Sequence, residues 1–135
     1  MKSSVSTTFL ILVILQALHS FEEYLGELWA NFPPATFLCG LISSDLEFGF
    51  LLINIGLFMA GLIVWWFPVR SGDSFGRFFI WFWIVIELLN GVIHPAWSIY
   101  QKAYTPGVIT APLLLLTALV LIKHVQTEKQ NNLQA

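Results

Sequence analysis

Four long stretches of this chain carry almost no charged side chains, and they constrain the fold more than any other feature. They cover residues 3–21, 48–69, 88–101 (extended back through 78–86, with one glutamate inside) and 103–122. Each approaches the roughly 20 residues that a helix needs to cross a hydrocarbon core about 30 Å thick. The apolar residues show neither a helical stripe nor strict alternation, so we expect four transmembrane helices.

The scarcity of charge supports a membrane location. Of the 135 residues, 10% are charged and 57% are hydrophobic, whereas roughly a quarter are charged in an ordinary soluble domain. So few charged side chains cannot cover a globule of this size, and a large apolar surface is expected to face the lipid bilayer. The net charge of −2 and the scattered basic residues give no indication of a nucleic-acid partner.

We therefore expect an all-α, integral membrane four-helix bundle. Residues 1–125 form its single four-helix domain, and residues 126–135 form a polar C-terminal tail. With four spans, one side of the membrane receives five of the six basic residues, which are Lys2, Arg70, Arg77, Lys123 and Lys129. The positive-inside rule then places both termini in the cytoplasm (N-in, C-in), and we expect the first span to be retained rather than cleaved as a signal peptide.

A longer connection joins the first two spans. Residues 24–45 are rich in aromatic residues and include Pro33 and Pro34. We expect an interfacial loop whose Trp and Phe side chains lie at headgroup level.

Polar residues inside the apolar spans are the candidate functional groups, because a charge placed in hydrocarbon costs at least about 2.5–3.5 kcal/mol. In the first span, His19, Glu22 and Glu23 stand at positions i, i+3 and i+4, within an arc of about 100°. In the third span, Glu87, Asn90 and His94 lie on one face of the helix.

These polar faces are expected to meet at one level of the bundle. The first and third helices run outward, so His19, Glu22, Glu23 and His94 lie near the outer end. Glu47 begins the second span at that end, and Tyr104, followed by Pro106 and Gly107, precedes the fourth. Asn54, midway along the second span, is a further candidate for lining a cavity.

The motifs His19-Ser-Phe-Glu22-Glu23, a second histidine at His94 and Tyr104-Thr-Pro106-Gly107 occur in that order. Together they resemble the HXXEE-domain family of small integral membrane proteins, over nearly the whole chain. The resemblance implies that the motif residues are functional, but it implies no particular reaction. Pro106 and Gly107 also suit a turn into the fourth helix.

The first hypothesis is a membrane enzyme with a divalent metal ion, either zinc, iron or manganese. His19, Glu22, Glu23 and His94 offer the nitrogen and oxygen ligands that suit these ions, and bundle cores commonly hold such sites. The metal would act as a Lewis acid on a hydrophobic or lipid-like small molecule, with its reactive group at headgroup depth.

Two other classes of function stay open. In a metal-free acid–base enzyme (an isomerase, cyclase or epoxide-opening enzyme), Glu22 or Glu23 holds a proton, His19 or His94 accepts one, and Tyr104 donates a proton or a hydrogen bond. In a proton-coupled carrier, or a binding or structural protein, the same residues form a pathway or interhelical hydrogen bonds. Small residues in the second span also make a homodimer plausible.

Overall fold

The computed structural model describes residues 3–134, without the side chain of Asn132, and it is all-helical in this range. The long helices are α1 (Ser3–Leu25), α4 (Leu46–Val64), α5 (Ser74–Gln101) and α6 (Ala111–Leu133). Two short helices, α2 (Leu28–Asn31) and α3 (Pro33–Ile42), connect α1 to α4, and a π-helical segment, η1 (Trp65–Val69), extends α4. The all-α class and the four long apolar helices are confirmed.

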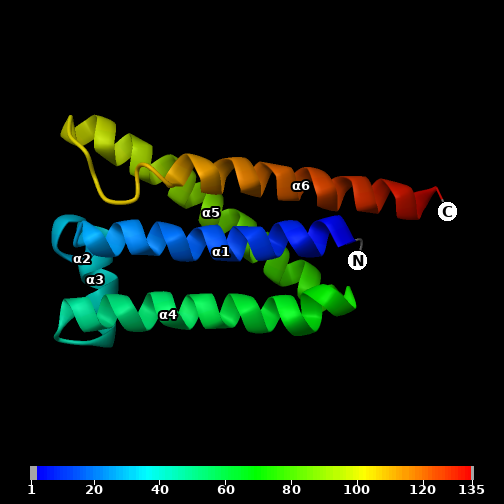
Figure 1. Cartoon of the computed structure of the whole chain (residues 1–135), viewed down its shortest axis with the longest axis horizontal. Helices are drawn as coiled ribbons and strands as arrows, with labels where there is room; N and C mark the ends of the chain where they lie inside the picture. The colour runs from blue at the N-terminus through cyan, green and yellow to red at the C-terminus, as the bar shows by residue number, and fades with distance from the viewer. Residues whose placement is uncertain (1–2, 135) are drawn as a thin grey trace.

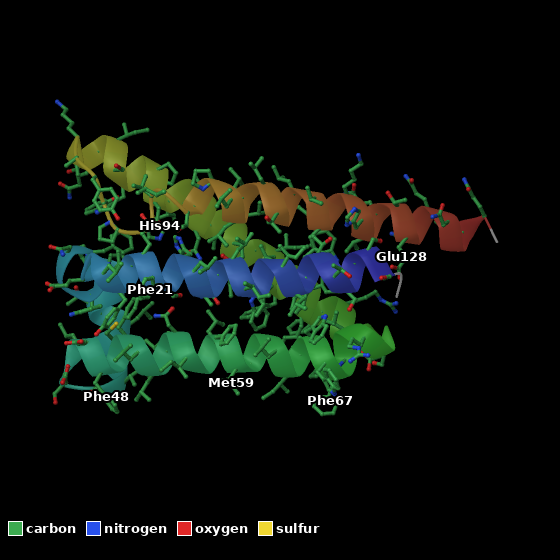
Figure 2. All side chains as sticks on the ribbon, in the orientation of Figure 1. Phe21, Phe48, Met59, Phe67, His94 and Glu128 are labelled. Atoms are coloured by element: carbon green, nitrogen blue, oxygen red, sulfur yellow. The ribbon has the colours of Figure 1, made fainter. Side chains whose placement is uncertain are left out.

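The surface of the four long helices is apolar. Ser3–Leu25, Leu46–Val69, Ser74–Gln101 and Ala111–Asn131 are each long and apolar enough to cross a membrane. Large apolar side chains lie exposed along them, and Phe48, Met59 and Phe67 project outward from α4 and η1 (Figure 2). Such a surface is stable against lipid and unstable against water, which is consistent with a multi-pass membrane protein.

Helix α1 lies between α4 and α6, and α5 crosses behind it (Figure 1). The core between the helices is built from Phe9 and Leu12 of α1, Ile80 and Trp83 of α5, and Leu114 of α6. The rings of Phe9 and Trp83 meet edge to face, 5.7 Å apart, so α1 and α5 are in direct contact. The start of α1 and the end of α6 lie at the same end of the molecule, opposite α2 and α3 (Figure 1).

The connection between α1 and α4 is helical, where the sequence analysis expected a loop. Phe32 is extended (φ −124°), which separates α2 from α3, and Pro33 occupies the first turn of α3, where a missing N–H costs little. Leu28, Trp29 and Cys39 pack against Phe50 of α4. This second small core explains why the segment folds back onto α4.

The connection between α5 and α6 is longer than expected, because α6 begins at Ala111 rather than at residue 103. Lys102 takes a left-handed conformation and ends α5, and Gly107 has a φ of +89° that L side chains rarely adopt. Residues 102–110 therefore form a loop, which we call the capping loop. At the other end of α6, residues 126–133 of the expected polar tail are helical. Lys2 and Ala135 lie outside the described residues.

Candidate functional site

Three buried side chains from α1 and α5 meet near the end of the molecule that carries α2 and α3. Glu23 Oε1 lies 3.3 Å from His19 Nε2 and 3.1 Å from His94 Nε2. His19, Glu23 and His94 are 1%, 8% and 5% exposed. Within residues 3–134 this is the one group of three or more potential metal-ligating side chains, with ligand atoms within 4.8 Å of one another.

Helix geometry explains this convergence. His19 and Glu23 are one turn apart on α1, so both side chains occupy one face. Helices α1 and α5 run in the same direction, and the Phe9–Trp83 contact fixes their relative position, so His94 arrives at the level of His19. The two imidazole rings meet edge to face with centroids 4.7 Å apart, and His94 lies where the capping loop approaches α1 (Figure 2).

The capping loop lies directly against both histidines. A Cβ atom at Gly107 would stand 2.6 Å from His94 Nδ1 and 2.8 Å from His19 Cε1, so only glycine fits there. Pro106 packs just as closely on Gly26, which follows α1. The loop thus closes the site from the side that faces away from the long helices.

Glu22 fixes the capping loop instead of joining the three-residue group. Its Oε1 accepts hydrogen bonds from Tyr104 OH (3.0 Å) and Ile109 N (3.1 Å). Its Oε2 accepts from Thr110 N (2.9 Å) and Thr110 Oγ1 (2.6 Å). A carboxylate has about four acceptor positions, so these four donors use all of them and leave none for a metal ion.

The hydrogen bond of His94 determines which of its nitrogens carries a proton. Nδ1 lies 2.7 Å from the carbonyl oxygen of Pro106. Because a carbonyl oxygen only accepts, Nδ1 must donate, and in the neutral ring the lone pair is then on Nε2. This lone pair is directed toward Glu23.

The same reasoning applies to His19 through one more hydrogen bond. Its Nδ1 lies 2.7 Å from Thr110 Oγ1, and the Thr110 hydroxyl donates its single hydrogen to Glu22 at 2.6 Å. Thr110 Oγ1 must therefore accept from His19 Nδ1, which leaves the lone pair of the neutral ring on Nε2. Within the described residues, this buried Nε2 forms no hydrogen bond.

Two imidazole lone pairs and a carboxylate oxygen therefore point at one another, an arrangement that a cation or a shared proton would stabilise. These three residues are the ones that could hold a divalent ion, since all three ligand atoms lie within 4.8 Å of one another. Two ligand atoms at the usual zinc distances, about 2.0–2.1 Å, are about 3.4 Å apart at a tetrahedral angle. The two separations that involve Glu23, 3.1 and 3.3 Å, are close to this value. Metal-binding histidines also donate their other N–H to an oxygen, as both rings do here.

The predicted residues Tyr104, Pro106 and Gly107 all belong to the capping loop. Tyr104 and Gly107 have the contacts described above, and Pro106 supplies the carbonyl that binds His94. Burial, the hydrogen bond to Glu22 and the negative charge of Glu22 raise the pKa of the Tyr104 hydroxyl. Tyr104 is largely exposed and is not in contact with the three-residue group.

The other supporting residues lie apart from the three-residue group. Glu47 accepts a hydrogen bond from Tyr24 at the start of α4 (2.7 Å), and Asn54 accepts one from Ser20 (2.6 Å). Asn90 donates to Glu87 Oε2 (3.1 Å), and Glu87 is fully buried toward the middle of α5. None of these four predicted residues belongs to the group of His19, Glu23 and His94.

Sequence reasoning missed Thr110, which links Glu22 to His19. Thr110 lies three residues beyond Gly107 and immediately before α6, with Pro112 in the first helical turn. Threonine before a helix with an early proline is a start signal that could have placed the helix boundary, and so the capping loop, correctly.

Comparison with known proteins identifies the family of this chain. Residues 10–122 match the model of a family described as "Protein of unknown function with HXXEE motif". No curated protein and no solved structure matched the chain. The matched region contains the motif His19, Glu22 and Glu23 together with His94 and the capping loop. The chain therefore belongs to the HXXEE family.

Proposed function

We propose that this chain is a membrane enzyme whose divalent metal ion is held by His19, Glu23 and His94. One observation carries the proposal: both Nε2 lone pairs are directed at Glu23 Oε1, because both Nδ1 atoms donate elsewhere. Zinc, iron and manganese all accept two imidazoles and one carboxylate. This assignment divides the HXXEE motif, with His19 and Glu23 as ligands and Glu22 as the residue that positions the capping loop.

The number of ligands favours catalysis over a purely structural role. Structural zinc sites use four protein ligands, whereas catalytic sites use three and keep a position for water or substrate. A bound ion supplies a Lewis acid. The residues of this chain hold it away from bulk water and fix the two imidazole rings through Pro106 and Thr110.

A membrane-embedded enzyme of this design would act on a hydrophobic or lipid-like molecule. Trp29 and Trp97 lie toward the end with the site, and Trp65 and Trp66 lie toward the opposite end, where Arg70 stacks 4.4 Å from the Trp66 ring. Aromatic residues at both ends are typical of the two membrane interfaces. The site would then lie at headgroup depth, within reach of the reactive group of an amphiphile.

Orientation is part of the proposal. Both chain ends lie on the side away from the site, together with Arg70, Arg77, Lys123 and Lys129. By the positive-inside rule, this side is cytoplasmic and the metal site faces outward.

Elemental analysis of the detergent-purified protein tests the metal ion directly. We expect about one zinc, iron or manganese ion per chain, and a loss to background in His19→Ala and in His94→Ala. His124→Ala is the matched control, since His124 lies on α6 outside the group and should leave the metal content unchanged. Metal-free protein with full activity, or equal metal content in all three variants, would contradict the proposal.

A metal-free acid–base enzyme is the second candidate, because Glu23 lies at ion-pair distance from both histidines. A proton on one ring could then occupy the place of the metal ion and take part in proton transfer. Under this alternative, chelators leave turnover intact and Glu23→Gln abolishes it. Loss of turnover on chelation, with recovery on adding zinc, iron or manganese, excludes it.

A further inference from the structure

A groove of about 500 Å³ lies beside the metal site, where α2, the end of α5 and the capping loop meet. Its walls include the aromatic side chains of Phe32, Trp97 and Tyr104. Polar groups are contributed by Asn31, Gln101 and Thr105. No Asp, Glu, Lys, Arg or His is among its described lining residues, so the groove combines apolar walls with neutral hydrogen-bonding groups.

Thr105 is the informative polar group of this groove. The residue is 6% exposed, and its hydroxyl has no hydrogen-bond partner among the described residues. A buried hydroxyl without a partner costs free energy comparable to a lost hydrogen bond. Because Thr105 lines the groove, a hydroxyl or carbonyl group bound there would supply the missing bond once the side chain turns toward it.

One layer of residues separates the groove from the metal site. The Phe32 ring lies 5.3 Å from the Trp97 ring and 6.3 Å from the His94 ring. On the other side, Pro106 forms part of the wall and binds His94 Nδ1 through its carbonyl oxygen. A molecule in the groove thus lies next to the two elements that cover His94.

We propose that this groove binds the head of a neutral amphiphile that carries a hydroxyl or carbonyl group. This binding does not depend on the proposed metal ion. Fatty acids and phosphate-bearing lipids are disfavoured, because none of the described residues that line the groove is a cation that would compensate a buried negative charge. The Glu22 carboxylate behind Tyr104 adds repulsion.

Photolabelling of the full chain in phosphatidylcholine nanodiscs tests the groove. Two diazirine probes share one long alkyl chain and differ only in the head, which is an alcohol or a carboxylic acid. We expect saturable labelling of peptides containing Trp97 and Tyr104 by the alcohol, with the acid at least about tenfold weaker, as burying an unpaired charge requires. Equal labelling by the two probes, or labelling spread evenly over the exposed faces of α4 and α6, would overturn the proposal.

Two variants connect the binding to particular residues. Thr105→Val keeps the shape of the side chain and should weaken alcohol labelling by about fivefold, the usual value of one neutral hydrogen bond. Thr117→Val is the control, since Thr117 is a half-buried residue of α6 and is not among the described residues that line the groove. If Thr105→Val proves unstable in a melting assay, Trp97→Leu replaces it and should also reduce labelling. Wild-type labelling in a folded Thr105 or Trp97 variant contradicts the proposal.

The same labelling on chelated protein separates this inference from the metal site. Selective alcohol labelling in a chain that binds no metal supports the groove as a binding site and contradicts the proposed metal centre. A chain that binds metal but shows no preference for the alcohol supports the metal centre and contradicts the proposal for the groove.

Discussion

Two histidines at opposite ends of the molecule make the same local hydrogen bond. At the site, His19 Nδ1 lies 2.7 Å from Thr110 Oγ1; near the chain ends, His124 Nδ1 lies 3.0 Å from Thr8 Oγ1. Each threonine donates its own hydrogen onward, Thr110 to Glu22 and Thr8 to the carbonyl of Ser4. One member of each pair belongs to α1, and the other belongs to α6 or to the loop that precedes it. Each hydrogen bond therefore links α1 to this second segment.

The two histidines differ in the surroundings of their other ring nitrogen, Nε2. His124 is half-buried and belongs to no described group of three ligating residues. His19 is 1% exposed, and its Nε2 faces Glu23 beside a second histidine whose lone pair has the same direction. A His–Thr pair by itself is sufficient to hold helices together. The buried carboxylate and the second imidazole are what would make such a pair part of the proposed cation site.

The largest expected effect comes from replacing, one at a time, the two adjacent glutamates of the motif, Glu22 and Glu23. Glu23→Gln removes a charged ligand, so zinc affinity should fall by more than the roughly 100-fold upper range for residues that only support a ligand. Glu22→Gln should cost less, about 10- to 100-fold, because it loosens the capping loop and leaves all three ligands. Competition titration with a chelator of known affinity measures both. Equal losses, or a larger loss for Glu22→Gln, would contradict the division of roles.

The next effect separates the two His–Thr pairs. Thr110→Val removes the oxygen that holds the His19 tautomer and should weaken metal binding by about 10- to 100-fold. Thr8→Val makes the same change at His124 and should leave the metal affinity unchanged. The same chelator competition measures both variants, with melting temperatures as a check on folding. Comparable loss of metal in the two variants would mean that the effect is one of general stability.

A smaller effect is expected at the glycine that touches both rings. Gly107→Ala places a Cβ against His94 and His19 at a left-handed φ, so we expect destabilisation by roughly 1–3 kcal/mol. Gly56→Ala is the control, because a Cβ there meets nothing within 4 Å and alanine favours a helix by about 0.5–1 kcal/mol. Thermal unfolding in detergent compares them. A Gly107 variant as stable as the Gly56 variant would show that the loop is not held against the rings.

The smallest effect concerns the exposed edge of the capping loop. The pKa of Tyr104 is raised by burial, by its hydrogen bond to Glu22 and by the charge of Glu22. The folded state therefore keeps this proton longer than the unfolded state, and the contribution of Tyr104 to stability is lost as pH rises above the ordinary tyrosine pKa. Ultraviolet titration should show a high-pH tyrosine that shifts down in Glu22→Gln. An unchanged tyrosine titration in that variant would show that Tyr104 and Glu22 are not in contact.

Sequence reasoning could predict the helices and the ligands for the same physical reason. Uncharged spans as long as these have few stable alternatives to crossing a membrane, and a buried ionisable residue such as His19 or His94 is costly unless partnered. Helical phase then brings Glu22, Glu23 and His19 to one face, but a phase argument has an uncertainty of about one residue. It could not decide which glutamate turns toward His94 and which toward Thr110.

The parts that sequence reasoning missed depend on contacts between distant segments. The helices α2 and α3 are short, and their position is set by packing against Phe50 rather than by a long apolar pattern. The apolar composition of residues 103–110 favours their inclusion in the fourth span, although Gly107 with its positive φ lies in the loop that precedes α6. The tautomers depend on Thr110 and the Pro106 carbonyl, which no spacing rule connects to His19 and His94.

X-ray absorption spectroscopy of the zinc-loaded protein tests the central claim most directly, because it reports the atoms bound to the ion. The account predicts two imidazole nitrogens and one carboxylate oxygen at about 2.0–2.2 Å. The spectrum should be unchanged in His124→Ala, whereas His94→Ala should retain no zinc after equimolar loading. A wild-type chain that retains no zinc after equimolar loading, or a spectrum without imidazole ligands, would contradict it.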